Sequence, residues 1–275
     1  GEEEATIALL SLRQVFSSMA KGAEVGLAGF GRPASTSVLC RNLGINVYEQ
    51  QDSQEFWKLL LPELNSPGLM DLYQGAYESY ISALDGSGRE RSREEAFLDL
   101  SLEVSSGSVA ASMEDMFTKP EVLSEKEGNG WRPEKGADKV DALKGTLLRV
   151  QGLPSLLQLH LMRFKYDWQT DTMSKINDRF TFPKTLDVSE ICTDIKQNEK
   201  SAAIYDLQSV VVHIGQYGSG HYYSYVRPDI NKNRWYRFDD DKVTEVSFDD
   251  VMKDAYGGED GTQKKGLLAR LFGGG

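Results

Sequence analysis

Apolar residues recur at helical spacing in the first part of the chain. Residues 4–20 form an amphipathic stretch with six apolar side chains on one face: Ala8, Leu9, Leu12, Val15, Phe16 and Met19. The next residues, 21–36, contain four glycines and a proline, so we expect a loop. A second helix is expected to begin at Asp52, an N-cap residue with Glu55 three positions later. Its inward side chains would be Phe56, Leu59 and Leu60.

The middle of the chain contains both helical and strand-like spacings of apolar residues. Residues 72–104 are expected to form strands around a polar tip, DGSGRERSREE. A short helix is predicted from Ser108 to Phe117. A loop or excursion follows at 125–139, and the spacing of apolar residues at 139–149 favours a helix.

Alternating apolar and polar residues dominate the last part of the chain and predict strands. The expected strands are 154–164, 203–215, 221–227 and 234–238. Residues 247–255 begin with a capping box, Ser247 and Asp250, and predict a helix. Because helices gather at the N-terminal end and strands at the C-terminal end, the predicted fold class is α+β.

Composition narrows the classes of function. The formal net charge of −11 over 275 residues argues against nucleic-acid binding and fits a basic partner. No apolar run approaches the ~18–20 residues of a membrane span, so no membrane partner is expected. The two cysteines, Cys40 and Cys192, do not make a disulfide framework, which favours a reducing compartment.

One histidine and one aspartate occupy mirrored positions near the C-terminus. The loop GQYGSG leads into His221, and the polar turn PDINKN separates 221–227 from 234–239. A hairpin centred on Ile230 would place residue 221 opposite residue 239, with Cβ atoms about 4.5–5.5 Å apart. A carboxylate there would hold the imidazole and fix its tautomer, as in a catalytic triad. On spacing alone, a structural histidine and a solvated turn are alternative interpretations, and a nucleophile is still needed.

Three segments resemble the boxes of one enzyme family. GSGHYYSYVRP with RWYRFDDDKVTEV resembles its His box, EQQDSQEFWKLLL looks like its QQD box, and LPSLLQLHLMRFKYDWQTDTMSKINDRFTFP resembles the block between them. The family is the ubiquitin-specific proteases (peptidase C19), and the likeness is greatest to its herpesvirus-associated member. The resemblance covers roughly 5–256. It implies a papain-like catalytic domain at 1–256 with thumb, palm and fingers, followed at 257–275 by a low-complexity tail or insertion that we expect to be disordered.

The resemblance also implies the site and the partners. It makes His221 the general base, Asp239 its orienting partner and Asp240 an assisting acid. The positions that match ubiquitin contacts are Asp52, Gln54, Glu55, Phe164, His213 and Tyr222. Helix capping by the acidic residues, and core packing by the aromatic residues and His213, are the alternatives. His160 is expected to be structural. Ubiquitin and ubiquitinated proteins are the implied partners, in the cytoplasm or the nucleus.

The sequence departs from the family pattern in two ways. The segment G-L-x-N-x-G-x-T-C-Y-x-N-S, which supplies the nucleophilic cysteine, is absent, and neither Cys40 nor Cys192 lies in a similar segment. We therefore expect a chain truncated at the N-terminus, with this Cys box just upstream of Gly1, and a C-terminal end that is also clipped. The zinc-binding cysteine pairs of the fingers are replaced at Pro133 and Gly136, so no zinc and no other cofactor are expected.

Two functions follow as hypotheses. The first is a cysteine-type deubiquitinase whose parent protein is active while the 275 residues alone are inactive or very weak. The second is a pseudo-deubiquitinase that binds ubiquitin without cleaving it. An α+β scaffold with no such function is a third interpretation.

Overall fold

The structure is a computed structural model that describes residues 5–24, 34–49 and 51–258. It divides into two compact units, one of Gly1–Gln74 with Pro154–Gln158 and one of Gly75–Leu153 with Leu159–Gly275. The expected domain boundary at 256–257 stays a prediction, and the tail from 259 onward lies outside the described residues. In the part of the chain that is described, no helix has both the length and the apolar composition needed to cross a bilayer.

The first unit is helical. Its helices are α1 (Ile7–Glu24), α2 (Ser37–Asn42), α3 (Ser53–Glu63) and α4 (Pro67–Tyr73). The predicted start of α3 is confirmed, because the Asp52 side chain accepts hydrogen bonds from the backbone N–H groups of Gln54 and Glu55 at 2.8 and 3.1 Å. The prediction at 21–36 is wrong for its first residues, since α1 continues to Glu24. The short helix α2 carries too few apolar positions for its period to be recognised.

The helices pack around a small apolar core. Its buried members are Ala8, Leu39, Leu60 and Leu64, with Phe56 and four leucines partly buried against them. The expectation for Leu59 is wrong, since its side chain is 42% exposed. The expectation for Leu60 is confirmed, and Leu61 is buried in place of Leu59.

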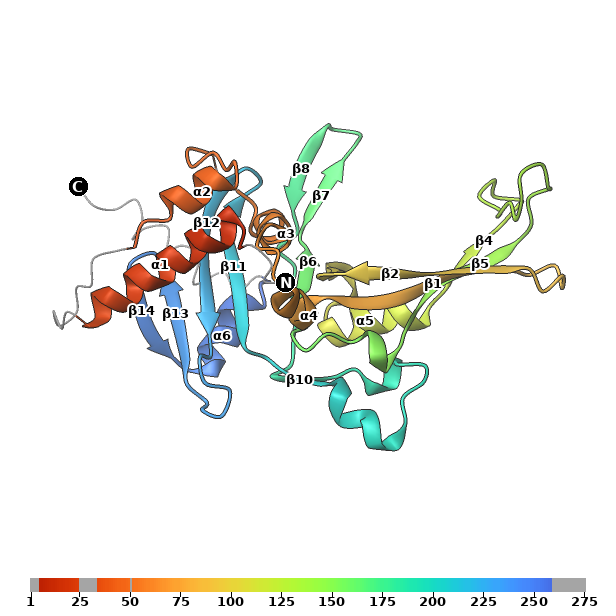
Figure 1. Cartoon of the computed structure of the whole chain (residues 1–275). Helices are drawn as coiled ribbons and strands as arrows, with labels where there is room; N and C mark the ends of the chain where they lie inside the picture. The colour runs from red at the N-terminus through yellow and green to blue at the C-terminus, as the bar shows by residue number, and fades with distance from the viewer. Residues whose placement is uncertain (1–4, 25–33, 50, 259–275) are drawn as a thin grey trace. The chain divides into compact units, whose positions relative to one another are not determined.

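The second unit begins with a four-stranded sheet in the order β2-β1-β5-β4 (Figure 1). Its strands are β1 (Gly75–Ala83), β2 (Glu90–Phe97), β4 (Glu121–Leu123) and β5 (Ala142–Leu148), and helix α5 (Val109–Thr118) packs along β5. The helix predicted at 139–149 is therefore wrong. β5 pairs with β1 on one side and β4 on the other. These two ladders outweigh the helical spacing of a short apolar run, and Gly145 in its centre disfavours a helix.

Short elements follow. The strands form pairs: β3 (Leu100–Glu103) with β6 (Leu159–Met162), β7 (Phe164–Asp167) with β8 (Thr172–Lys175), and β9 (Thr185–Asp187) with β10 (Ile204–Asp206). The 3₁₀ helices are η1 (Val104–Ser106), η2 (Val150–Gly152), η3 (Ser189–Ile191) and η4 (Gln197–Ala203). The strand predicted at 154–164 is confirmed only at 159–162, where it pairs in parallel with β3.

The C-terminal elements form a second four-stranded sheet in the order β11-β12-β13-β14 (Figure 1). Its strands are β11 (Ser209–Gln216), β12 (Ser219–Val226), β13 (Trp235–Asp239) and β14 (Lys242–Val246), followed by α6 (Phe248–Ala255). The predicted capping box of α6 is confirmed at Ser247 and Asp250. One face of the sheet packs on α6 around buried Tyr223, Tyr225, Trp235 and Val251. This face carries the candidate site.

Candidate functional site

His221 and Asp239 are in contact. Their Nε2 and Oδ1 atoms are 2.6 Å apart, and the two side chains are 36% and 25% exposed. The predicted register is wrong, because Val226 pairs with Tyr236 and the hairpin is centred on Asn231 instead of Ile230. The prediction of proximity is nevertheless confirmed. The register differs by two residues on β13, and side chains repeat their face every two residues, so the contact is diagonal instead of direct.

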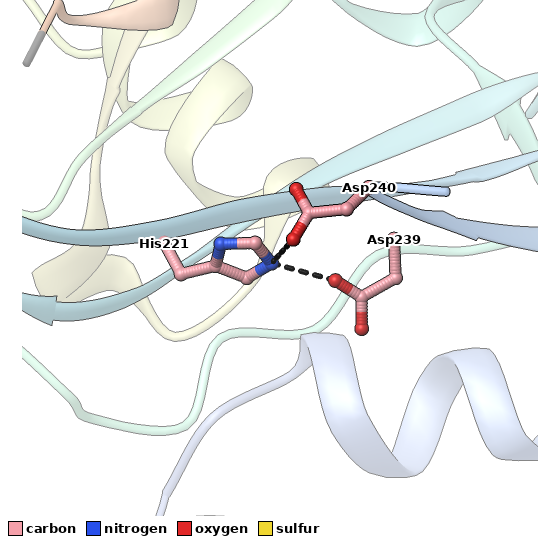
Figure 2. Close-up of side chains that lie close together, drawn as sticks. All are labelled: His221, Asp239 and Asp240. Atoms are coloured by element: carbon pink, nitrogen blue, oxygen red, sulfur yellow. Dashed lines mark hydrogen bonds and ion pairs between the residues drawn. The ribbon is translucent and has the colours of Figure 1, made fainter. Parts of the chain in front are cut away.

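The imidazole is oriented by this contact. A carboxylate only accepts hydrogen bonds, so Nε2 carries the proton and donates a hydrogen bond to Asp239 Oδ1. Figure 2 shows that Nδ1 lies on the other side of the ring from both labelled carboxylates. The sp² nitrogen that remains basic in this tautomer is therefore the one turned away from the acids.

Asp240 lies farther from the ring. Its Oδ2 is 3.9 Å from His221 Nε2 and its side chain is 77% exposed. Asp240 is part of the two-residue turn between β13 and β14, and its backbone is left-handed with φ 52°, a conformation that aspartate tolerates better than most residues. Asp239 therefore has the closer and more buried contact of the two.

Arg237 also belongs to the site, although sequence reasoning did not single it out. Its Nη2 lies 2.7 Å from Asp239 Oδ2. The signal that could have found it is its position two residues before Asp239 on one strand, which places both side chains on one face.

Phe164, His213 and Tyr222, the predicted contacts of the ubiquitin tail, lie together in one aromatic cluster, and their role in binding stays a prediction. The His213 ring lies 5.6 Å from Phe164 and 4.7 Å from Tyr222 between centroids. Lys175 Nζ donates to His213 Nδ1 at 2.9 Å and to its carbonyl oxygen at 2.7 Å, which joins β8 to β11. A Cβ atom on Gly220 would lie only 2.3 Å from His213 Nε2, so this glycine is required by packing.

The predicted ubiquitin contacts at the start of α3 lie in the first unit. Asp52 caps α3, and Gln54 and Glu55 lie in its first turn. These three residues belong to the first unit, whereas His221 belongs to the second. Helix capping, the alternative for Asp52, is confirmed, and a role in binding stays a prediction. His160 lies on β6 with Nδ1 3.3 Å from Ser101 Oγ, which agrees with a structural role.

Comparison with known proteins identifies the family. Residues 8–257 match the family model described as ubiquitin carboxyl-terminal hydrolase. The chain belongs to the ubiquitin carboxyl-terminal hydrolase family. Relatives in this family include ubiquitin carboxyl-terminal hydrolase 15 of Schizosaccharomyces pombe, 34% identical over 95% of this chain, and ubiquitin C-terminal hydrolase 13 of Arabidopsis thaliana, 33% identical over 82%. The chain spans only 23% and 21% of the lengths of these two relatives.

Solved structures confirm the fold of this chain. The Ubp8/Sgf11/Sus1/Sgf73 module of SAGA bound to ubiquitin aldehyde matches with a TM-score of 0.72 and 23% identity, over 92% of this chain and 58% of that one. The module bound to monoubiquitin matches with a TM-score of 0.71 and 24% identity, over 92% and 57%. The α+β, papain-like fold class predicted from the sequence is therefore confirmed.

Cys192 is not arranged as a nucleophile. Cys192 is buried, and burial followed by the charges of Asp194 and Asp187 raises the pKa of its thiol to about 11. A nucleophilic cysteine needs the opposite shift. Cys40 lies in the short helix α2, and its side chain is partly exposed.

We expect Cys192 to react slowly with iodoacetamide in the folded chain. A thiol pKa of about 11 against the ordinary 9.0 leaves roughly 100-fold less thiolate at pH 8. Folding raises the pKa of the Cys192 thiol, so its contribution to the stability of the folded chain is complete below pH 9. That contribution is lost as the pH rises through about 11. Peptide mass spectrometry after alkylation at several pH values measures this, with urea-unfolded chain as control. Equal labelling of folded and unfolded Cys192 at pH 8 would contradict the raised pKa of its thiol.

The candidate metal ligands coincide with the site itself. Within the described ranges, the group of His221, Asp239 and Asp240 is the one whose ligand atoms lie close enough together, within 4.8 Å. At the two residues that replace the family's zinc-binding cysteines, the Pro133 carbonyl accepts a hydrogen bond from Arg91 Nη2 at 3.0 Å, and Gly136 has a positive φ of 91°. The side chain of Arg91 on β2 thus contacts this segment, and the absence of zinc stays a prediction.

Proposed function

We propose that the chain is the greater part of the catalytic domain of a cysteine-type deubiquitinase, whose nucleophilic thiol lies outside the 275 residues. The observation that carries the proposal is the 2.6 Å contact between His221 Nε2 and Asp239 Oδ1 in a member of this family. A domain that only bound ubiquitin would not require that contact. His221 is the general base, Asp239 orients it, and Asp240 assists from the neighbouring turn.

The chemistry follows from the tautomer. With its proton on Nε2, His221 presents Nδ1 to a thiol, removes the thiol proton and becomes an imidazolium held by Asp239. The thiolate attacks the carbonyl carbon of the C-terminal glycine of ubiquitin. The C–N bond then breaks as the imidazolium donates its proton to the leaving amine, which leaves a thioester. Water, deprotonated by His221, hydrolyses the thioester and releases ubiquitin with a free carboxylate.

Ubiquitin and ubiquitinated proteins are the proposed partners. The solved modules of similar fold carry ubiquitin or ubiquitin aldehyde, and the net charge of −11 suits a basic peptide tail. We assign contacts with the tail to the Phe164, His213 and Tyr222 cluster, and to Asp52, Gln54 and Glu55 at the start of α3. The proposed location is the cytoplasm or the nucleus.

The test is covalent capture of the thiol. The longest natural reading frame that contains this chain is mixed with ubiquitin carrying a C-terminal vinyl-type electrophile. We expect an adduct one ubiquitin heavier, with the modified cysteine identified by peptide mass and labelling slowed in His221→Gln. Cys192→Ser is the matched control and should label at the wild-type rate. An adduct that forms equally in His221→Gln would rule out His221 as the base.

A pseudo-deubiquitinase is the second candidate, favoured by one observation. Of the two thiols in the chain, Cys192 is buried with a raised pKa, and Cys40 lies in a different unit from His221. In the same experiment this candidate gives no adduct, while ubiquitin still binds reversibly and binding falls in Asp52→Ala.

A further inference from the structure

The carboxylate of Asp239 is held at both of its oxygens. Oδ1 accepts from His221 Nε2 at 2.6 Å, and Oδ2 lies 2.7 Å from Arg237 Nη2. The terminal torsion of an aspartate is soft, so a single hydrogen bond to the imidazole leaves the carboxylate plane free to turn. Two bonds to different partners fix that plane, and the plane decides whether a carboxylate oxygen stays in hydrogen-bonding position at His221 Nε2.

Arg237 is itself held by an aromatic ring. Its Cζ lies 4.2 Å from the ring centroid of Tyr223, within the range of a cation–π contact, and its side chain is 26% exposed. The Tyr223 ring also lies against the imidazole of His221, with centroids 6.5 Å apart and planes 28° from parallel. Tyr223 is therefore next to both groups that meet at Asp239.

Helix α6 anchors this ring. The hydroxyl groups of Tyr223 and Tyr225 both donate to Asp254 Oδ2, the latter at 2.8 Å. Burial, together with the nearby charge of Asp254, raises the pKa of both tyrosines well above the ordinary range, so the hydroxyls remain protonated donors. A continuous series of contacts thus runs from α6 through Tyr223 and Arg237 to Asp239.

We propose that Arg237 is a positioning residue for the His221–Asp239 pair. Its bond to Oδ2 holds the carboxylate so that Oδ1 accepts from Nε2, which keeps the imidazole proton on Nε2 and leaves Nδ1 basic. The positive guanidinium also offsets the negative charge of Asp239. Arg237 therefore orients the carboxylate but does not strengthen its attraction for a positively charged His221. What Nδ1 serves rests on the proposed function, whereas the orientation of the imidazole is a property of the chain itself.

A purely structural role would have different consequences. If Arg237 only covered the Tyr223 ring, its removal would lower the melting temperature and leave the imidazole tautomer unchanged. If Arg237 positions Asp239, its removal changes the tautomer in a chain that is still folded. The imidazole nitrogens therefore report on positioning independently of stability.

The first experiment measures that tautomer by nitrogen NMR on the ¹⁵N-labelled 275-residue chain. The chain has three histidines, so the His221 signals can be assigned from their loss in His221→Gln. We expect the wild type to carry the proton on Nε2 and Arg237→Met to show a mixture of both tautomers. Arg234→Met is the matched control, since Arg234 is 66% exposed and its nearest carboxylate, on Glu245, is 4.0 Å away. A wild-type pattern in folded Arg237→Met would overturn the proposal.

Arg237→Lys decides the question if Arg237→Met does not fold. Lysine keeps a cation over the Tyr223 ring but lacks the planar fork that can reach both the ring and Oδ2. We expect an intermediate mixture of tautomers. A wild-type pattern in this variant overturns the proposal as well.

The second experiment measures hydrolysis of a ubiquitin-amide substrate by the longest natural reading frame. Arg237→Met should lower kcat by about 10-fold to 100-fold with KM within about twofold, and Arg234→Met should change neither. An unchanged kcat in Arg237→Met overturns the positioning role while the deubiquitinase stands. If even the wild type is inactive but the tautomer shifts in Arg237→Met, the positioning role stands and the proposed function fails.

Discussion

Asp239→Asn is expected to lower kcat for a ubiquitin-amide substrate by about 10³-fold to 10⁴-fold. Arg237 supplies the reason. Its Nη2 needs an acceptor at the Oδ2 position, 2.7 Å away, so an asparagine will turn its carbonyl oxygen toward Arg237. The amide NH₂ then faces His221, where it can only donate. Nε2 becomes the acceptor, the proton moves to Nδ1, and the imidazole can no longer remove a proton from a thiol.

The matched control is Asp240→Asn. This variant makes the same replacement of a carboxylate by an amide, at a side chain that is 77% exposed and 3.9 Å from His221 Nε2. We therefore expect kcat to fall only a few-fold. Both variants should melt near the wild-type temperature. Steady-state kinetics on the longest natural reading frame measures the difference. A larger loss in Asp240→Asn than in Asp239→Asn would reverse the assignment of the two carboxylates.

Trp235→Ala is expected to cost about 3–5 kcal/mol of unfolding free energy and roughly 10 °C in melting temperature. Trp235 is fully buried between the second sheet and α6, with its ring 5.4 Å from that of Phe248 between centroids. Its removal opens a cavity under the strand that ends at Asp239. Thermal and urea denaturation of the purified chain measure the loss.

The chain offers a second tryptophan as the control. Trp168, between β7 and β8, is 78% exposed, so Trp168→Ala should change the unfolding free energy by less than about 0.5 kcal/mol. Trp235→Phe should fall between the two alanine variants, because it keeps a ring in the core. Similar losses for both alanine variants would mean that burial does not set the contribution of Trp235.

The sequence predicts elements best where local chemistry decides them. Asp52, Ser108 and Ser247 each cap the helix expected to follow, because capping depends only on the next few residues. The local sequence does not predict the strand within 139–149, because its state is decided by β1, about 60 residues earlier in the chain. The sequence does not predict β14, because Thr244 and Glu245 separate its two valines.

The same distinction between local and long-range contacts applies to the site. The contact between His221 and Asp239 could be predicted because one hairpin carries both residues, and the wrong register preserved the face. Arg237 could not be ranked above other surface arginines, since its importance depends on Tyr223, which is diagonal to it on the neighbouring strand. The contact of Lys175 with His213 could not be predicted for a comparable reason, because Lys175 lies on a different pair of strands.

The order of strands in the second sheet has a consequence for folding. Neighbours in β11-β12-β13-β14 are also neighbours along the chain, and His221 and Asp239 are only 18 residues apart. The parallel pair β3 and β6 instead brings together Ser101 and His160, 59 residues apart. Closing the longer loop costs only about 1 kcal/mol more in entropy, but low contact order speeds folding considerably. The histidine–carboxylate pair therefore belongs to a part of the chain that can assemble early, before the long-range pairings of the same unit are complete.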